Sequence, residues 1–252
     1  MSSSSLMKTL LVFIITLNSC NTKEYEHRAD IFSGEEYLWK ECDIHFLTRK
    51  YHGECVYYHK DGAKMRTREY QDGEIHGKEI EYDLDGQIAN ISYYNNGNLE
   101  ESVSFYENGE LSFKYSCYLE DGSDICKETE YTKKGVIKGE THYKDYNYHG
   151  ERKKYHTNGV LWYHSIYSNG CLENIVEVND SLGNKLDYGD YESGSGLLRC
   201  FHPDGQVDHV GYIKDYFQVG KWSFTTRNGR VMVAHDFDKE PGDKCNYEFV
   251  VY

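Results

Sequence analysis

A glycine recurs at a fixed place in a unit of about 24 residues, and the unit occurs eight times along the chain. Nine residues before this glycine stands another repeated position, which is glycine in five of the eight copies. A fixed period of this length is typical of repeat proteins, in which one supersecondary unit stacks on its neighbours. The eight pairs of positions are Gly53–Gly62, Gly77–Gly86, Glu100–Gly109, Cys126–Gly135, Gly150–Gly159, Asn174–Gly183, Gly196–Gly205 and Gly220–Gly229.

Two rows of aromatic residues follow the same period. When the first position is counted as zero, position five holds Tyr58, Tyr82, Phe105, Tyr131, Tyr155 and Phe201. Position seventeen holds Tyr70, Tyr94, Tyr143, Tyr167, Tyr191 and Phe237. Position twenty holds Gly73, Gly97, Gly170 and Gly194, with Tyr146 and Tyr216 in two other copies. The copy from Asn174 departs most from this pattern, which indicates either a distorted unit or a bend between two arrays.

The glycines predict tight turns between short strands. The residue before the second glycine is usually Asp or Asn, and such pairs tolerate positive φ and fit type I′ turns. The segments between turns are rich in Tyr, Ile, Val and Thr, which favour strands. Each unit is therefore predicted to be strand, turn, strand, turn. Helices are disfavoured because glycine recurs too often for them.

Tyrosine supplies much of the apolar surface of this chain. The 252 residues include 25 tyrosines, while only 38% of all residues are hydrophobic. A tyrosine ring buries area while its hydroxyl reaches water, which suits a thin sheet. Composition thus predicts an elongated sheet with tyrosine ladders, stabilised by contacts between neighbouring units.

The net charge of −14 limits the classes of partner. No basic cluster is dense enough to neutralise phosphate backbones, so nucleic acid is not expected as a partner. The chain also lacks a polybasic patch for anionic lipid.

The N-terminal residues have the features of an export signal. Lys8 precedes the apolar run Thr9–Leu17, which is too short to span a membrane. The run ends in Leu17-Asn18-Ser19-Cys20, which looks like a bacterial lipobox, with Asn18 as a departure from it. We therefore expect residues 1–19 to be a lipoprotein signal peptide and Cys20 to be lipidated. A short membrane anchor and an ordinary secretory leader are the alternatives.

Seven cysteines remain if Cys20 is lipidated. Export permits disulfides, and Cys42–Cys55 or Cys117–Cys126 could pair across neighbouring strands. The odd number argues against a complete disulfide framework. We expect most of these cysteines to be small buried hydrophobic residues.

The segment Tyr70 to Ile88 (YQDGEIHGKEIEYDLDGQI) resembles the MORN repeat, and in particular its bacterial variant family. Tyr143 to Val160 (YKDYNYHGERKKYHTNGV) shows the pattern again, and the resemblance covers about residues 50–237. It implies an all-β fold, a single-layer twisted antiparallel sheet of stacked hairpins. Members of the family serve as scaffolds, dimerisation surfaces or membrane-proximal binding modules, usually without catalysis. Many bacterial members carry an antitoxin-type label, which indicates little about mechanism.

Catalytic and metal sites are not predicted. His52, His76 and His149 precede leading glycines, and copies two strands apart stand about 10 Å from each other, too far to share one ion. The carboxylate pairs Glu100 with Glu101 and Asp187 with Asp190 fit a solvated acidic surface. No nucleophile, phosphate-binding or metalloprotease motif occurs. We expect no enzyme activity, no cofactor and no metal; a metalloenzyme site near Asn174 is the least favoured alternative.

The sequence therefore predicts five segments and one kind of function. They are a signal peptide (1–19), a tether (20–35), N-terminal cap strands (36–52), eight repeats (53–243) and a closing strand (244–252). We expect a membrane-anchored lipoprotein of the bacterial cell envelope that binds an unidentified protein partner, with homodimerisation as a further hypothesis. The alternatives are a carbohydrate-binding surface and an antitoxin-like or immunity partner. The candidate interaction residues are Tyr58, Tyr70, Tyr82, Tyr94, Tyr131, Tyr143, Tyr155 and Tyr167. The glycines assigned to repeat turns are Gly62, Gly86, Gly109, Gly135, Gly159, Gly183, Gly205 and Gly229.

Overall fold

The computed structural model describes residues 25–31, 38–226, 229–238 and 245. The chain divides into two compact units, residues 1–115 and residues 116–252, and each is described by itself. The predicted signal peptide, Cys20 and residues 246–252 lie outside the described residues. The described part of the chain contains no helix able to span a membrane.

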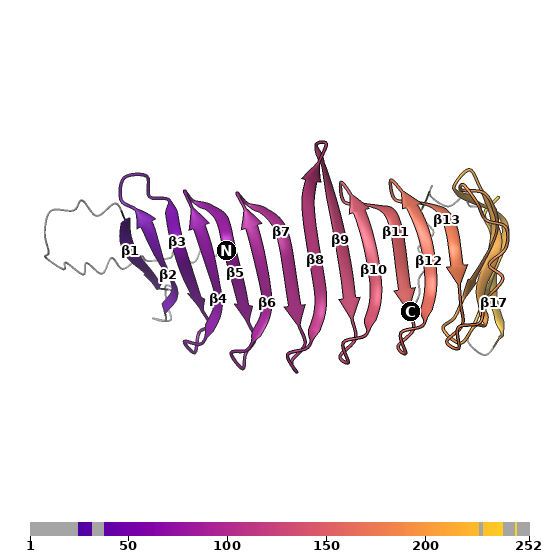
Figure 1. Cartoon of the computed structure of the whole chain (residues 1–252), viewed down its shortest axis with the longest axis horizontal. Coiled ribbons are helices and arrows are strands. Elements are labelled where there is room, and N and C mark those ends of the chain that lie inside the picture. Colours follow the sequence, from indigo (N-terminus) through magenta and orange to yellow (C-terminus); the bar gives the residue numbers. More distant parts are fainter. Residues whose placement is uncertain (1–24, 32–37, 227–228, 239–244, 246–252) are drawn as a thin grey trace, which may run out of the picture. The chain divides into compact units, whose positions relative to one another are not determined.

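Regular structure in the described residues consists of antiparallel strands joined by short turns (Figure 1). In the larger sheet, strand order follows chain order from β1 to β13. The strands of this sheet are β1 (Tyr25–Ile31), β2 (Leu38–His45), β3 (Tyr51–Tyr58), β4 (Lys64–Gln71), β5 (Glu74–Tyr82), β6 (Ile88–Asn95), β7 (Asn98–Phe105), β8 (Leu111–Glu120), β9 (Ser123–Tyr131), β10 (Ile137–Lys144), β11 (Asn147–Tyr155), β12 (Leu161–Ser168) and β13 (Cys171–Val178). This arrangement confirms the predicted all-β sheet of consecutive hairpins.

Two kinds of turn alternate along the repeats. The eight repeat glycines have a positive φ, between 75° and 87°, and in the seven turns that the structure describes in full only the glycine does. In the first of these turns, Gly62 N donates to His59 O (3.0 Å) and His59 N to Ala63 O (2.8 Å). This is the three-residue hairpin loop that ends in a left-handed glycine, so the prediction of type I′ turns is wrong here. The preceding Asp or Asn instead accepts a hydrogen bond, as Asp61 does from Ala63 N (3.0 Å).

Type I′ turns do occur, but at position twenty of the unit. There both central residues have positive φ, as in Asp72 (52°) and Gly73 (90°) or Asn169 (48°) and Gly170 (83°). Such turns match the twist of the two strands that they join. The unit therefore alternates a three-residue turn with a two-residue turn.

The first unit begins with a strand in part of the predicted tether. Tyr25–Ile31 forms β1 and pairs with β2, which corrects the expectation of a tether at these residues. Cys42 on β2 and Cys55 on β3 lie directly opposite each other and form a disulfide. With Tyr57 they make the buried cluster of this unit, against which Trp39, Tyr51, Met65 and Tyr70 pack.

In the second unit a smaller sheet follows the larger one. Its strands, in spatial order, are β14 (Gly196–Phe201), β15 (Val207–Lys214), β16 (Phe217–Thr225) and β17 (Val231–Asp236). The break between the sheets falls in the copy from Asn174, at residues 179–195, where only isolated bridges occur. In that copy position five holds Asn179 instead of an aromatic residue. Its buried side-chain amide donates to Leu161 O (3.1 Å), so the row of aromatic residues at position five is interrupted there. The irregular copy thus separates two arrays of strands.

The two sheets of the second unit share one hydrophobic core. Leu172, Ile175 and Val178 of β13 meet Leu198 and Trp222 of the smaller sheet. Trp222 has no exposed surface, and a Cβ added at Gly211 would collide with its indole ring. Tyr163 Oη accepts a hydrogen bond from Phe201 N (2.7 Å), which joins the sheets through a polar contact. A two-layered core of this kind was not part of the prediction from sequence.

Six of the seven cysteines that follow Cys20 are paired. Besides Cys42–Cys55, the structure has Cys117–Cys126 and Cys171–Cys245. The expectation that most cysteines are unpaired hydrophobic residues is therefore wrong, and it holds only for buried Cys200. Cys171 and Cys245 are 74 positions apart in the chain, which is why their pairing is invisible in local spacing.

Candidate interaction surface

The predicted tyrosine rows are structural rather than exposed. None of the eight candidate tyrosines is exposed; seven are half-buried and Tyr167 is buried. Their hydroxyls reach carboxylates on neighbouring strands: Tyr58 donates to Glu41 (2.8 Å) and Tyr155 to Glu140 (3.0 Å). Burial and the Glu41 hydrogen bond together raise the pKa of Tyr58 to about 12. Most of these groups already have partners within the sheet.

Three tyrosine rings of the second unit form a continuous row. The ring centroids of Tyr143 and Tyr148 are 5.2 Å apart, and those of Tyr148 and Tyr167 are 5.4 Å apart. The Arg152 guanidinium carbon lies 4.7 Å from the centroid of Tyr148, within cation–π range. Tyr143 also donates to Glu128 (2.5 Å), and burial raises the pKa of its hydroxyl. This row stabilises the sheet face and leaves little ring surface for a ligand.

In the first unit, the corresponding sheet face carries an ion-pair network. Arg68 lies opposite Glu79 and pairs with it, while Arg66 lies opposite Glu81 with an Nε–Oε1 distance of 3.3 Å. Next along the sheet, Asn90, Ser92 and Ser102 bond to one another through their side chains. Each of these side chains has a partner on this face, although Arg66 Nε is paired with Glu81 by charge alone and makes no hydrogen bond.

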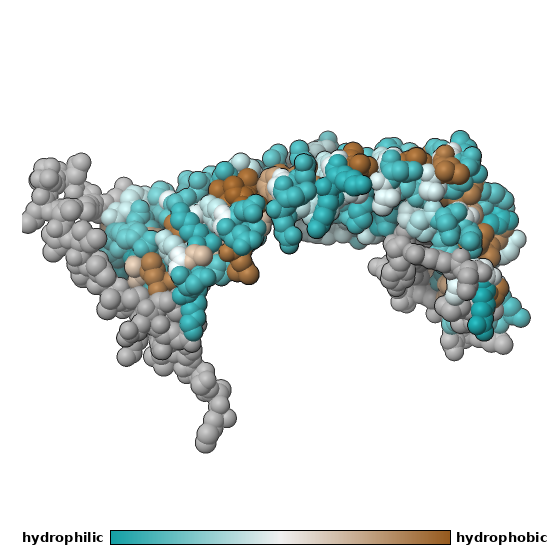
Figure 2. All heavy atoms as spheres, turned by 90° about the horizontal axis from the view of Figure 1, so that it is seen from below, coloured by the Kyte–Doolittle hydropathy of each residue, from teal (hydrophilic) through white to brown (hydrophobic). Residues whose placement is uncertain are grey.

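Exposed apolar side chains are scattered rather than continuous. Figure 2 shows a mostly hydrophilic face with separate hydrophobic spots. Among the residues that the structure describes, the exposed aromatic ones are Phe46, Tyr93, Tyr118, Tyr146, Tyr212 and Phe217. None of them was a candidate from sequence, because the repeat pattern singled out the residues that pack.

Tyr146 is the most unusual of the exposed residues. Its side chain is 86% exposed, and its φ is +66° in a turn where other copies have glycine. A left-handed conformation costs a non-glycine residue roughly 1–2 kcal/mol. Tyr216 has a similar φ of +68°, but its hydroxyl donates to Glu173 (2.8 Å), which explains its retention. Among the described residues, the side chain of Tyr146 has no hydrogen bond or ring contact that would offset the cost of its left-handed backbone. The sequence signal for this exposed residue is that Tyr146 stands at a position where other copies have glycine.

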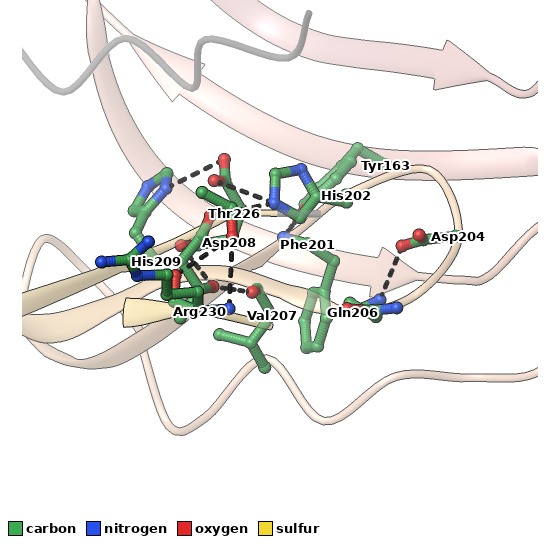
Figure 3. Close-up of polar contacts among 11 residues, drawn as sticks. Tyr163, Phe201, His202, Asp204, Gln206, Val207, Asp208, His209, Thr226 and Arg230 are labelled. Carbon is green, nitrogen blue, oxygen red and sulfur yellow. Dashed lines mark hydrogen bonds and ion pairs between the residues drawn. The ribbon is translucent and has the colours of Figure 1, made fainter. Parts of the chain in front are cut away.

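Two histidines flank one carboxylate in the smaller sheet. Figure 3 shows Asp208 between His202 (Nε2–Oδ1 3.4 Å) and His209 (Nδ1–Oδ2 3.3 Å). Burial lowers the pKa of His209, although Asp208 opposes that shift. The His209 ring stacks on Phe224, with centroids 5.6 Å apart, and lies opposite Cys200 in the strand register. Burial raises the pKa of the Cys200 thiol, which keeps it in the protonated, weakly reactive form.

Histidines of the larger sheet and its turns lie in different places. His142 Nδ1 is 2.8 Å from Glu151 O, and His156 Nε2 is 3.1 Å from Asn179 O. The Nδ1 atoms of His52 and His149 are buried without a hydrogen-bond partner. Within the described ranges, no three His, Cys, Asp or Glu side chains are grouped to hold a metal ion.

Comparison with known proteins identifies the repeat. The family model described as MORN repeat variant matches residues 75–96 and 148–169. The first match covers most of β5 and β6 with their turn, and the second covers most of β11 and β12 with theirs. The matches confirm the resemblance seen in the sequence. No curated protein is significantly similar to this chain.

Two of the solved structures that match this chain are distant likenesses. One is accessory secretory protein 1, 2 and 3 of Streptococcus pneumoniae, at 16% identity and a TM-score of 0.27, over 51% of this chain and 22% of that one. Another is the Tc holotoxin pore of Photorhabdus luminescens, at 12% identity and a TM-score of 0.16, over 90% of this chain and 14% of that one. With TM-scores this low, neither likeness informs fold or function.

Proposed function

This chain is a MORN-repeat protein, and from that premise we propose that it is a non-catalytic interaction module, anchored by lipid on Cys20 in the bacterial cell envelope. The partner in this proposal is a protein rather than nucleic acid, and a second copy of the chain is one candidate for it. No cofactor or metal takes part.

The exposed, left-handed Tyr146 carries the protein-binding part of the proposal. A tyrosine in a glycine position costs conformational energy that its own fold does not offset. Tyrosine is enriched in the energetic centres of protein interfaces, where a large ring meets a partner at low entropy cost. A glycan surface is less well supported, because the rings of the predicted rows pack within the sheet.

Replacement of Tyr146 by glycine tests the interaction. We expect no loss of thermal stability, because glycine adopts this φ freely, and at least a fivefold drop in crosslinked partner recovered from the native envelope. Quantitative mass spectrometry of the crosslinked material measures the second effect. Tyr212→Ala is the matched control: Tyr212 is also exposed in the second unit but has ordinary strand geometry. Equal recovery with Tyr146→Gly and the intact protein would contradict the proposal.

Replacement of Cys20 by alanine tests the anchor. We expect loss of incorporated labelled fatty acid and a shift of the protein from the membrane to the soluble fraction, since lipid chains supply the membrane affinity. Globomycin should cause the precursor of the unaltered protein to accumulate. Cys200→Ala also removes an unpaired cysteine and should leave the label in place. Labelling that persists in Cys20→Ala would show that Cys20 is not the lipidation site.

A further inference from the structure

The hairpin formed by β8 and β9 extends beyond its neighbours in the second unit. β8 has ten residues, whereas β10 and β12, which lead into the corresponding turns, have eight each. Two further residues lengthen a strand by about 7 Å. In Figure 1 the β8–β9 turn accordingly lies beyond the β10–β11 and β12–β13 turns. The end of this hairpin, residues 118–124, belongs to the second unit and is called the hairpin tip below.

A disulfide and a tight turn limit the conformational freedom of the hairpin tip. Cys117 of β8 and Cys126 of β9 form a disulfide at its base. At its end Asp121 (φ 49°) and Gly122 (80°) form a two-residue type I′ turn, which matches the twist of the strands that it joins. A loop held in this way loses less conformational entropy when it binds a partner than a flexible loop does. The hairpin tip is therefore organised for binding before a partner arrives.

The hairpin tip exposes two consecutive apolar side chains. Tyr118 is 60% exposed and Leu119 is 72% exposed. Successive residues of a strand point to opposite faces, so the hairpin tip has apolar surface on both faces. Among the described residues, the side chain of Tyr118 has no hydrogen bond or ring contact. Apolar groups on both faces suit insertion into a cleft better than contact with a flat surface.

The hairpin tip is joined to the turn that carries Tyr146. Asp145 N donates to Asp124 O (2.9 Å), and Asp124 N donates to Asp145 Oδ1 (2.9 Å). Since β9 and β10 are neighbouring strands, Tyr118, Leu119 and Tyr146 lie on adjoining turns. Single exposed apolar residues are ordinary on a protein surface, whereas three of them on two joined turns favour an interaction site.

Carboxylates accompany these apolar side chains. The hairpin tip and residues 144–147 carry four carboxylates and one lysine, which gives a local net charge of −3. These charged residues are Glu120, Asp121, Asp124, Lys144 and Asp145. None of the four carboxylates forms an ion pair with a cation in the described part of the chain. A partner with complementary charge therefore needs basic groups beside the cleft that receives the apolar side chains.

We propose that the hairpin tip, together with Tyr146, inserts into an apolar cleft of a protein partner whose rim carries lysine or arginine. This inference rests on the proposed function: it extends the contact of Tyr146 to a defined surface and names the chemistry of the partner. A second copy of this chain suits the site less well, because its net charge of −14 sets like charges against the hairpin tip. Anionic lipid headgroups repel the same carboxylates.

Photocrosslinking in the native envelope tests which molecule meets the hairpin tip. In the full chain, p-benzoylphenylalanine replaces Tyr118, Tyr146 or Tyr212, one at a time. The probes at Tyr118 and Tyr146 should capture the same protein, on peptides that contain lysine or arginine. Tyr212, which is exposed on β15 of the same unit, is the matched control and should not capture it. Capture of a second copy or of lipid by the probe at Tyr118 would overturn the proposal.

Binding of the purified captured protein to full-length variants measures the apolar contacts. Tyr118→Ala and Leu119→Ser should each weaken binding by about tenfold or more, as truncation of a side chain buried in an interface does. Leu182→Ser is the matched control, because Leu182 is 84% exposed in the same unit but lies after β13, away from the hairpin tip, and should have no effect. The melting temperatures should stay within about 2 °C of one another, since all three side chains are exposed. Equal binding by Leu119→Ser and the intact protein would overturn the proposal.

The charge and the rigidity of the hairpin tip are tested in the same assay. Glu120→Lys should weaken binding about tenfold, because it sets a like charge against a basic rim. Glu192→Lys, at an exposed carboxylate elsewhere in the second unit, should not. Cys117→Ala/Cys126→Ala should weaken binding about fivefold, since the freed loop loses more conformational entropy on binding. Equal effects of Glu120→Lys and Glu192→Lys would overturn the assignment of a basic rim.

Failure of the hairpin tip and failure of the proposed function give different results. If neither the probe at Tyr118 nor the probe at Tyr146 captures a protein, the proposed function is defeated. If Tyr146 captures a protein that Tyr118 does not, and Leu119→Ser binds that protein as tightly as the intact chain, only the hairpin tip is excluded from the contact.

Discussion

Replacement of Trp222 by alanine is expected to lower the free energy of unfolding of the second unit by about 3–5 kcal/mol, the usual range for truncation of a large buried aromatic residue. Trp222 is completely buried between the smaller sheet and β12 and β13. Its indole packs against Gly211, which has no side chain that could move into the cavity left by the truncation. Its Nε1–H also donates to Tyr212 O (3.2 Å), and the carbonyl would lose that partner.

Urea unfolding followed by far-UV circular dichroism measures this effect. Phe217→Ala is the matched control, because Phe217 is an aromatic residue on the same strand but is exposed, and its loss should cost under about 1 kcal/mol. Gly211→Ala places a methyl group against the indole of Trp222. This overpacking should lower the free energy of unfolding by about 1–3 kcal/mol. A Trp222→Ala effect as small as that of Phe217→Ala would mean that the two sheets do not share a core.

Removal of the Cys171–Cys245 disulfide should be the most destabilising of the three disulfide deletions, at about 4–5 kcal/mol. The reason is the length of chain that it closes: its cysteines are 74 positions apart, against 13 for Cys42–Cys55 and 9 for Cys117–Cys126. A longer loop removes more conformational freedom from the unfolded chain. For each of the shorter loops the same relation gives about 3 kcal/mol.

Urea unfolding under oxidising conditions measures this order of stability losses, on variants in which both cysteines of one pair are replaced by alanine. The Cys42→Ala/Cys55→Ala and Cys117→Ala/Cys126→Ala variants serve as controls, since each removes one disulfide of a short hairpin. The same three proteins under reducing conditions should show no comparable order, because the constraint is then absent from all of them. A loss for the Cys171–Cys245 pair no larger than for the hairpin pairs would contradict the loop-length explanation.

The local structure of the repeats was predictable because it depends on neighbouring residues. Glycines such as Gly62 and Gly73 mark the turns, since each position needs a left-handed backbone. The type of turn was less predictable. Asp61 and Asp72 both precede glycine, yet only Asp72 has positive φ, and the difference lies in how the adjacent strands pair.

The candidate site was harder to predict, because exposure and charge balance depend on pairing across strands. Tyr167 fits the repeat pattern as an interaction residue but is buried by its neighbours. Tyr146 breaks the pattern and is exposed. Arg68 and Arg152 both lie in strands. Only the strand register shows that Arg68 lies opposite Glu79, whereas Arg152 lies opposite Thr141.

The sequence by itself determined the period of the array, its all-β nature, the glycines of its turns and the copy in which the pattern fails. These follow from backbone preferences and spacing within about 24 residues. Only the tertiary structure decided that strands after the Asn174 copy form a second sheet on β12 and β13, that Cys171 pairs with Cys245, and that Arg68 lies opposite Glu79. Each of these depends on contacts between residues on different strands or far apart in the chain, and a repeat pattern carries no information about which such residues will meet.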